Sequence, residues 1–190
     1  MKKSLIQLFL VISLCFLLCF SISCQNQEAM VDQKAMAELE EFKVQAEVEE
    51  QNKELVKRLW EAWSKGDFEA FKELVAPDFA HYLPSGSTKP SSREETIEIG
   101  KGLHNAFPDI TFSIKELIAE GDRVTVRFIY RGTHKGEFEG IPATGNEFEG
   151  SGISISRIEN GKVVEQRKEI DALGMMQQLG MELKPKEAEK

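Results

Sequence analysis

Apolar residues recur at helical spacing over the first part of the globular region, which we expect to begin near residue 52. One apolar stripe predicts a helix that ends at Lys65-Gly66, because glycine favours helix termination. Asp67 is a suitable N-cap for a second helix, which Pro77 would end. A third helix is predicted to open at the capping-box sequence of residues 92–95 and to close at Phe107, before Pro108.

Beyond Pro108 the apolar spacing changes from helical to twofold, which is typical of strands. Alternation predicts strands over residues 110–118, 123–131, 148–158 and 162–171, in addition to a short strand over 79–82. Glu159-Asn160-Gly161 has the composition of a tight hairpin turn. A short helix over 172–179 follows the last strand. This order predicts an α+β fold with three N-terminal helices packed on one face of a curved antiparallel sheet.

The N-terminal segment has a different pattern. Lys2 and Lys3 precede an apolar run up to Phe20, and small residues lead to Cys24. This order is typical of an export signal and resembles that of a bacterial lipoprotein, in which the cysteine is lipidated. We therefore expect a signal peptide over 1–23 and a membrane-anchored lipoprotein on the periplasmic or cell-surface side. An uncleaved transmembrane anchor is the alternative, because the run is close to the shortest that spans a bilayer.

Residues 24–51 follow as an acidic tether. Eight acidic residues face only Lys34 and Lys43 over 25–51, without proline or glycine, so this segment is expected to be helical or disordered. The domain proper is expected over 52–180, and residues 181–190 form a polar tail.

Charge and cysteine usage exclude several function classes. The chain has a formal net charge of −8, and removal of Lys2 and Lys3 leaves 22 basic against 32 acidic residues, or −10. Such a balance argues against nucleic-acid binding, which depends on basic groups that neutralise phosphates. All three cysteines lie within the first 24 residues, so the domain has no disulfide framework and no thiol nucleophile. The histidines His81, His104 and His134 form no metal-binding pair, which argues against a metal site.

The last predicted strand carries most of the candidate chemistry. Uniform alternation places Glu165, Arg167, Glu169 and Asp171 on the same face as Val163. Three carboxylates and one guanidinium in a partly buried pocket would raise the pKa of one carboxyl group, which suits acid–base chemistry at a carbonyl compound. An edge strand with both faces in water is the alternative interpretation.

Five tracts in the domain are distinctive as an ordered series: Phe107-Pro108-Asp109, residues 132–136 (Gly-Thr-His-Lys-Gly), 140–145 (Gly-Ile-Pro-Ala-Thr-Gly), 160–165 (Asn-Gly-Lys-Val-Val-Glu) and 171–180 (Asp-Ala-Leu-Gly-Met-Met-Gln-Gln-Leu-Gly). The series resembles the SnoaL-like family of polyketide and ester cyclases, within the nuclear transport factor 2-like superfamily, over about residues 52–180. The resemblance implies a cone-shaped fold with an apolar cavity and a homodimer formed through the sheet.

The resemblance also implies an activity. Characterised cyclases of this family close a polyketide methyl ester by a cofactor-free intramolecular aldol reaction, with an aspartate on the last strand as the acid–base residue. Asp171 matches that aspartate. Arg167 and Glu169 depart from the family pattern, in which tryptophan and an apolar residue are common at these positions. Near Arg157, no histidine corresponds to the partner that some of the cyclases have.

Three hypotheses for function follow. In the first, an enzyme without cofactor or metal acts on a small apolar carbonyl compound. Its catalytic residues are Asp171, Arg167 and Glu169, and its pocket is walled by Tyr82, Trp60, Trp63, Phe107, Phe128 and Glu165. His81, the strand neighbour of Tyr82, is then expected to face the surface. In the second, the same cavity binds a hydrophobic ligand without chemistry, which export and tethering favour. A sheet-mediated assembly domain is the third and plainest alternative.

Overall fold

A computed structural model describes the backbone of residues 2–182 and the side chains of residues 33–182. Its elements are α1 (Lys2–Lys65), α2 (Phe68–Leu74), β1 (Val75–Tyr82), α3 (Arg93–Ala106), β2 (Thr111–Glu120), β3 (Arg123–Thr133), β4 (Glu147–Glu159), β5 (Lys162–Ile170) and α4 (Ala172–Gln178). The side chains of the predicted signal peptide over 1–23, the predicted lipidation site Cys24 and most of the tail lie outside the described residues.

Helix α1 continues through the predicted acidic tether, so the segment 24–51 is helical. The chain divides into two compact units, up to Glu47 and from Val48 onwards. In the second unit, α1 is fastened to the β2–β3 turn: Gly121 donates its N–H to Glu49 Oε1 (2.9 Å), and Asn52 Nδ2 donates to the Gly121 carbonyl (3.0 Å). No helix among the residues with described side chains has the length and apolar character needed to cross a membrane.

Capping contacts confirm the predicted starts of α2 and α3, whereas α2 ends at Leu74 and the expected stop, Pro77, lies within β1. Asp67 accepts a hydrogen bond from the Ala70 N–H and begins α2. Ser92 and Glu95 form the full capping box at the start of α3. At the β4–β5 turn, Asn160 and Gly161 both take positive φ (50° and 72°), as a tight hairpin turn of this composition requires.

The sheet has five strands in the order β1-β5-β4-β3-β2. The predicted α+β class is confirmed and the sheet is mostly antiparallel, but β1, at one edge, pairs with β5 in parallel. β1 is also longer than predicted and begins at Val75. The chain leaves β1 through α3 and three further strands before it returns as β5. No local turn therefore fixes their relative direction, and periodicity along the sequence could not show it.

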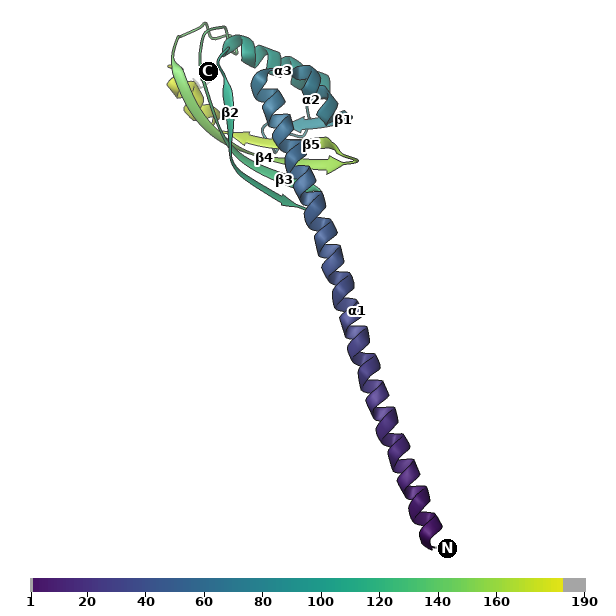
Figure 1. Ribbon diagram of the computed structural model, residues 1–190. Helices are drawn as coiled ribbons and strands as arrows, with labels where there is room; N and C mark the ends of the chain where they lie inside the picture. The colour runs from purple at the N-terminus through teal and green to yellow at the C-terminus, as the bar shows by residue number, and fades with distance from the viewer. Residues whose placement is uncertain (1, 183–190) are drawn as a thin grey trace, which may run out of the picture. The chain divides into compact units, whose positions relative to one another are not determined.

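The helices cover one face of this curved sheet, with α3 and the end of α1 on the same side (Figure 1). The core between them is aromatic: Trp60 of α1 packs on Phe128 of β3, with ring centroids 4.3 Å apart. Inward-facing glycines make room for these rings. A Cβ at Gly152 of β4 would lie 2.5 Å from a Phe128 ring atom, and one at Gly150 would lie 2.4 Å from the Tyr130 ring.

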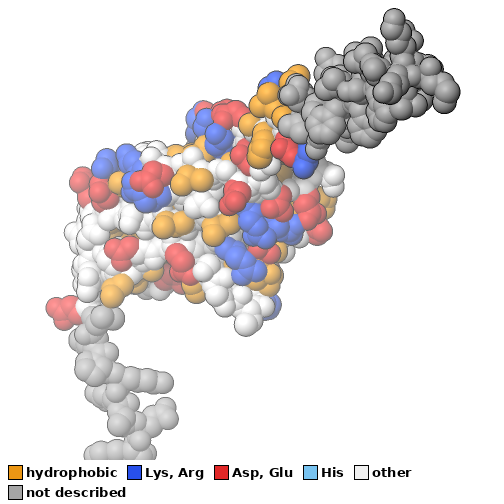
Figure 2. Space-filling view, turned by 90° about the horizontal axis from the view of Figure 1, so that it is seen from below, with side chains coloured by type: hydrophobic (Ala, Val, Ile, Leu, Met, Phe, Trp, Pro, Cys, Tyr) orange, Lys and Arg blue, Asp and Glu red, His pale blue; other side chains and the backbone are white. Residues whose placement is uncertain are grey.

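The opposite surface is polar. Figure 2 shows a face on which acidic and basic side chains lie next to one another, with apolar side chains scattered between them. Ion pairs across strands, such as Arg127 with Glu116 (2.8 Å), belong to the outer side of the sheet. Two half-exposed isoleucines of β4, Ile153 and Ile155, lie on that outer side as well.

A bulge in β5 decides which side chains of the last strand face the helices. Arg157 of β4 pairs with Glu165, whereas the next residue, Ile158, pairs with Val163. Val164 is therefore the extra residue of the bulge, and the alternation reverses across it. Val163, Gln166 and Lys168 are all buried.

Candidate functional site

A cavity of about 340 Å³ lies between the inner face of the sheet, α3 and the end of α1. Its walls are mostly apolar, with Trp63 from α1, Ile99 and Leu103 from α3, and Phe112, Phe128 and Ile170 from the sheet. The loop after β3 contributes Phe138 and the exposed Glu137 and Glu139. Lys168 of β5 lines the same space, and we call it the Lys168 cavity. An apolar hollow with a few convergent polar groups is the usual form of a small-molecule site.

Lys168 is the most unusual residue of this cavity. Its side chain is 7% exposed, and no carboxylate of the described residues forms an ion pair with it. The Nζ atom lies over the rings of Trp60 and Trp63, 5.1 and 5.3 Å from their centroids. Burial lowers the pKa of Lys168 to about 8, because an ammonium group loses its hydration in an apolar interior.

Other buried polar groups surround Lys168. His81 of β1 lines the cavity and is 3% exposed, and Ser154 of β4 is the register partner of Lys168. Within the described protein, His81 Nε2, Ser154 Oγ and the indole N–H groups of Trp60 and Trp63 have no hydrogen-bond partner. Burial, and then the charge of Lys168, lowers the pKa of His81 to about 3, so its imidazole is neutral near pH 7. Most of these groups can donate a hydrogen bond, and Trp63 and His81 belong to the residues that line the cavity.

Asp171, the predicted catalytic aspartate, caps helix α4. Its Oδ1 accepts the Gly174 N–H at 2.8 Å, and its side chain is exposed. The backbone carbonyl of Asp171 accepts a hydrogen bond from Tyr130 Oη at 3.3 Å. Tyr130 lines the cavity, and burial together with the Asp171 carboxylate raises its pKa to about 12. Asp171 therefore lies beside the cavity, behind Tyr130, and does not line it.

The expectation that Glu165, Arg167 and Glu169 line the pocket is wrong. Arg167 Nε donates to Glu165 Oε1 (2.9 Å), and Arg167 Nη1 donates to the Ser85 carbonyl (2.9 Å). Glu169 accepts the Ser85 N–H at 2.9 Å. These contacts lie on the side of the sheet opposite Lys168, because the bulge at Val164 reverses the alternation assumed from the sequence. The cluster holds the loop after β1 in place.

Tyr82 was expected to line the pocket and His81 to face the surface, and the structure shows the reverse. The Arg167 guanidinium lies 4.0 Å from the Tyr82 ring centroid, on the outer side, whereas His81 is buried in the cavity. Trp63 and Phe128 line the cavity as predicted. Trp60 lies beneath it, against Lys168, and Phe107 belongs to the core with the rings of Phe138, Phe148 and His134.

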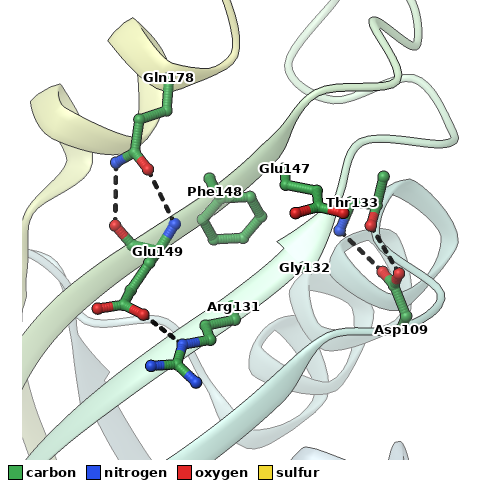
Figure 3. Close-up of a pocket in the computed structure, with 8 residues that line it drawn as sticks. All are labelled: Asp109, Arg131, Gly132, Thr133, Glu147, Phe148, Glu149 and Gln178. Carbon is green, nitrogen blue, oxygen red and sulfur yellow. Dashed lines mark hydrogen bonds and ion pairs between the residues drawn. The ribbon is translucent and has the colours of Figure 1, made fainter.

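A second depression, about 480 Å³, lies over β3 and β4 (Figure 3). Most of its polar groups are engaged with one another. Asp109 accepts hydrogen bonds from the N–H (2.8 Å) and Oγ1 (2.7 Å) of Thr133, which hold the pKa of its carboxyl well below the usual range. Gln178 of α4 pairs with the backbone of Glu149, whose carboxylate binds Arg131. We assign this depression a structural role.

The distinctive sequence tracts make the same kind of contact. His134 is fully buried, and its Nδ1 lies 3.1 Å from Thr144 Oγ1, so the tract 132–136 holds the tract 140–145. Asp109, Asp171 and Gln178 fix the loop ends and α4 against the sheet. These tracts identify the fold more directly than they identify a reacting group.

Lys168 and His81 are two cavity residues that uniform alternation along the strands does not predict. One feature of the sequence could have indicated Lys168. The face of the last strand with Gln166, Lys168 and Ile170 carries fewer charges than the face with Glu165, Arg167 and Glu169. Among the described residues, no group of three or more His, Cys, Asp or Glu side chains is placed to hold a metal ion.

Comparison with protein families gives a match over residues 53–179 to the model described as SnoaL-like polyketide cyclase. Aklanonic acid methyl ester cyclase DnrD of Streptomyces peucetius is 32% identical over 133 residues, which cover 67% of this chain and 89% of the relative. Aklanonic acid methyl ester cyclase DauD of Streptomyces sp. (strain C5) is also 32% identical over 133 residues, 67% of this chain and 80% of the relative.

Solved structures share the fold. IdmH from Streptomyces antibioticus aligns with a TM-score of 0.61 and 33% identity, over 69% of this chain and 99% of that one. AclR from Streptomyces galilaeus aligns with a TM-score of 0.64 and 30% identity, over 70% of this chain and 97% of that one.

Proposed function

Because this chain belongs to the SnoaL-like polyketide cyclase family, we propose that it binds an apolar carbonyl compound in the Lys168 cavity and activates the carbon beside that carbonyl for aldol-type cyclisation or isomerisation. The observation that carries the proposal is the buried Lys168 on the wall of an apolar cavity, beside Trp63 and His81, whose buried ring nitrogens have no partner within the described protein. The names of two relatives support the substrate class, since both are cyclases of a methyl ester.

The geometry suits stabilisation of an enolate. Removal of a proton from the carbon beside a carbonyl moves negative charge onto the carbonyl oxygen. Lys168 and Trp63 both line the cavity, and the Lys168 ammonium would stabilise that charge strongly because the cavity walls are mostly apolar. The apolar walls would hold the carbon skeleton.

Two groups are candidates for the proton transfer itself. His81 is neutral and lines the cavity. Asp171 is the position that matches the family aspartate, and it lies behind the cavity-lining Tyr130. The acid–base role of Asp171 stays a prediction of the sequence.

Binding can be followed through the two tryptophans of the chain, since Trp60 and Trp63 both lie against Lys168. We expect aklanonic acid methyl ester to quench their fluorescence saturably. A Cβ added at Gly102 of α3, on the cavity wall, meets no atom within 4 Å. Gly102→Leu should therefore fold normally and occupy the cavity, weakening binding about tenfold or more, whereas Gly102→Ala should bind as the unmodified chain does.

Chromatography and mass spectrometry of the same mixtures test the chemistry. An enzyme of the proposed kind converts the ester into an isomer of equal mass, whereas a binding protein returns it unaltered. Asp171→Asn keeps a good N-cap residue, so loss of turnover with unchanged melting would assign the proton transfer to Asp171. Equal affinity for Gly102→Leu and Gly102→Ala would show that the ligand does not enter this cavity.

A further inference from the structure

We propose that the Lys168 amine forms a Schiff base with a ketone or aldehyde group of the ligand in the Lys168 cavity. The inference rests on the proposed function, because it requires a carbonyl compound in the same place. Beyond that function, the inference assigns a covalent bond between the ligand and Lys168.

The first support is the placement of the side chain. Lys168 lies on the inner face of β5, nearly buried, and lines the cavity together with Trp63 and His81. No acidic side chain of the described residues forms an ion pair with Lys168. A lysine that serves only as a structural cation would be expected to have such a partner when buried.

The second support is the accessibility of the neutral amine, which is the nucleophilic form. Burial brings the pKa of Lys168 to about 8, so about half of the molecules carry a neutral amine at pH 8. The faces of Trp60 and Trp63 act in the opposite direction and favour the ammonium. Both protonation states are therefore accessible near neutral pH, as Schiff-base chemistry requires.

The third support is the set of groups around the amine. His81 from β1 and Tyr130 from β3 are the titratable side chains that line the cavity from the sheet, and Glu137 and Glu139 line it from the loop after β3. α1 and α3 contribute Trp63, Ile99 and Leu103, which carry no charge. Neutral His81 Nε2 and Ser154 Oγ have no partner within the described protein and can accept or relay a proton beside the amine.

The step balances without any further reagent. The Lys168 nitrogen attacks the carbonyl carbon, and the carbonyl oxygen takes up the proton that the nitrogen releases, which gives a carbinolamine. Loss of one water molecule then forms the C=N bond. Protonation of that imine makes the hydrogen on the neighbouring carbon more acidic. Removal of this hydrogen as a proton gives an enamine, which is the carbon nucleophile of an aldol closure. Addition of water afterwards releases the product carbonyl and restores the amine.

Benzoylacetone is a suitable probe, because an apolar β-diketone condenses with an amine to a conjugated enaminone that absorbs in the near ultraviolet. The full chain is incubated with this probe near pH 8. We expect one adduct per chain, with the mass of the probe less one water molecule, and peptide mapping should place it on Lys168. Its rate of formation should rise with pH through a midpoint near 8 instead of near 10.5.

Two lysine substitutions make the test specific. Lys168→Met should reduce the adduct at least about tenfold while tryptophan quenching by benzoylacetone persists, because the cavity keeps its shape. Lys162→Met changes an exposed lysine of the same strand, whose Nζ contacts the Glu73 carbonyl, and should leave the adduct unchanged.

The outcomes separate the two proposals. Saturable quenching without an adduct, or an adduct that survives Lys168→Met, overturns the Schiff base and leaves the proposed function standing. If neither benzoylacetone nor aklanonic acid methyl ester quenches the tryptophans, the proposed function fails as well.

Discussion

Lys168 carries a titratable amine into the apolar interior, and its protonation is therefore coupled to folding. Its pKa falls from 10.5 to about 8 on folding, so between these values the unfolded chain binds more protons than the folded chain does. The contribution of this residue to the free energy of unfolding therefore rises with pH between about 8 and 10.5. Below pH 8, the cost of burying the charged ammonium is fully present.

A pH series on Lys168→Met tests this coupling. Methionine has no charge to bury, so the variant should be more stable than the unmodified chain at pH 7. Its advantage should shrink by up to about 3 kcal/mol as the pH approaches 10.5. Urea unfolding measures the difference, and Lys162→Met should show no such trend. A pH-independent difference would mean that Lys168 is not desolvated in the folded chain.

At the scale of the elements, the inner face of β4 is shaped by glycine. Gly150 and Gly152 lie under Tyr130 and Phe128, and the two rings form part of the cavity wall. Space at Gly152 is limited by backbone as well, because a Cβ there would lie 2.6 Å from the Glu169 carbonyl oxygen. That carbonyl cannot move without disturbing the β4–β5 pairing.

Gly152→Ala should therefore destabilise the domain by roughly 1–3 kcal/mol, as overpacking of a filled core does. Ser151→Ala, at the exposed neighbouring position, should change stability by less than about 0.5 kcal/mol. Chemical unfolding of both variants provides the measurement. Equal stability of the two would contradict the close approach of Phe128 and Glu169 to β4.

At the scale of the whole molecule, the acidic net charge and the N-terminal signal pattern bear on where the protein is located in the cell and not on its reaction. The sequence predicts that an acidic tether separates the domain from a lipid-modified Cys24. In a bacterial host, the unmodified chain should then incorporate labelled palmitate and fractionate with membranes.

Substitution of the cysteines tests this location. Cys24→Ala should abolish incorporation of the label, whereas Cys19→Ala should retain it. Membrane retention without label in the unmodified chain would instead indicate an uncleaved anchor.

Much of the fold could be predicted because its signals are local. The N-caps Asp67 and Ser92, the turn at Asn160-Gly161 and the twofold alternation of β3 each depend on residues close together in the chain. The family could also be recognised from the sequence. Its distinctive tracts include Asp109, His134 and Gln178, which make contacts that hold the fold together. Sequence alone thus determined the α+β class, the starts of α2 and α3 and the family, but not the start of β1 at Val75.

The tertiary structure decided which chemistry faces the cavity. A single extra residue, Val164, reverses the alternation of β5, so Lys168 faces inward while Glu165 and Arg167 pair outside. The alternation of residues along a strand does not reveal a bulge, because the position of the bulge depends on pairing with the neighbouring strand. The burial of His81 could not be predicted for the same reason, since it depends on the parallel pairing of β1 with β5. The reactive face was therefore fixed by contacts between distant residues.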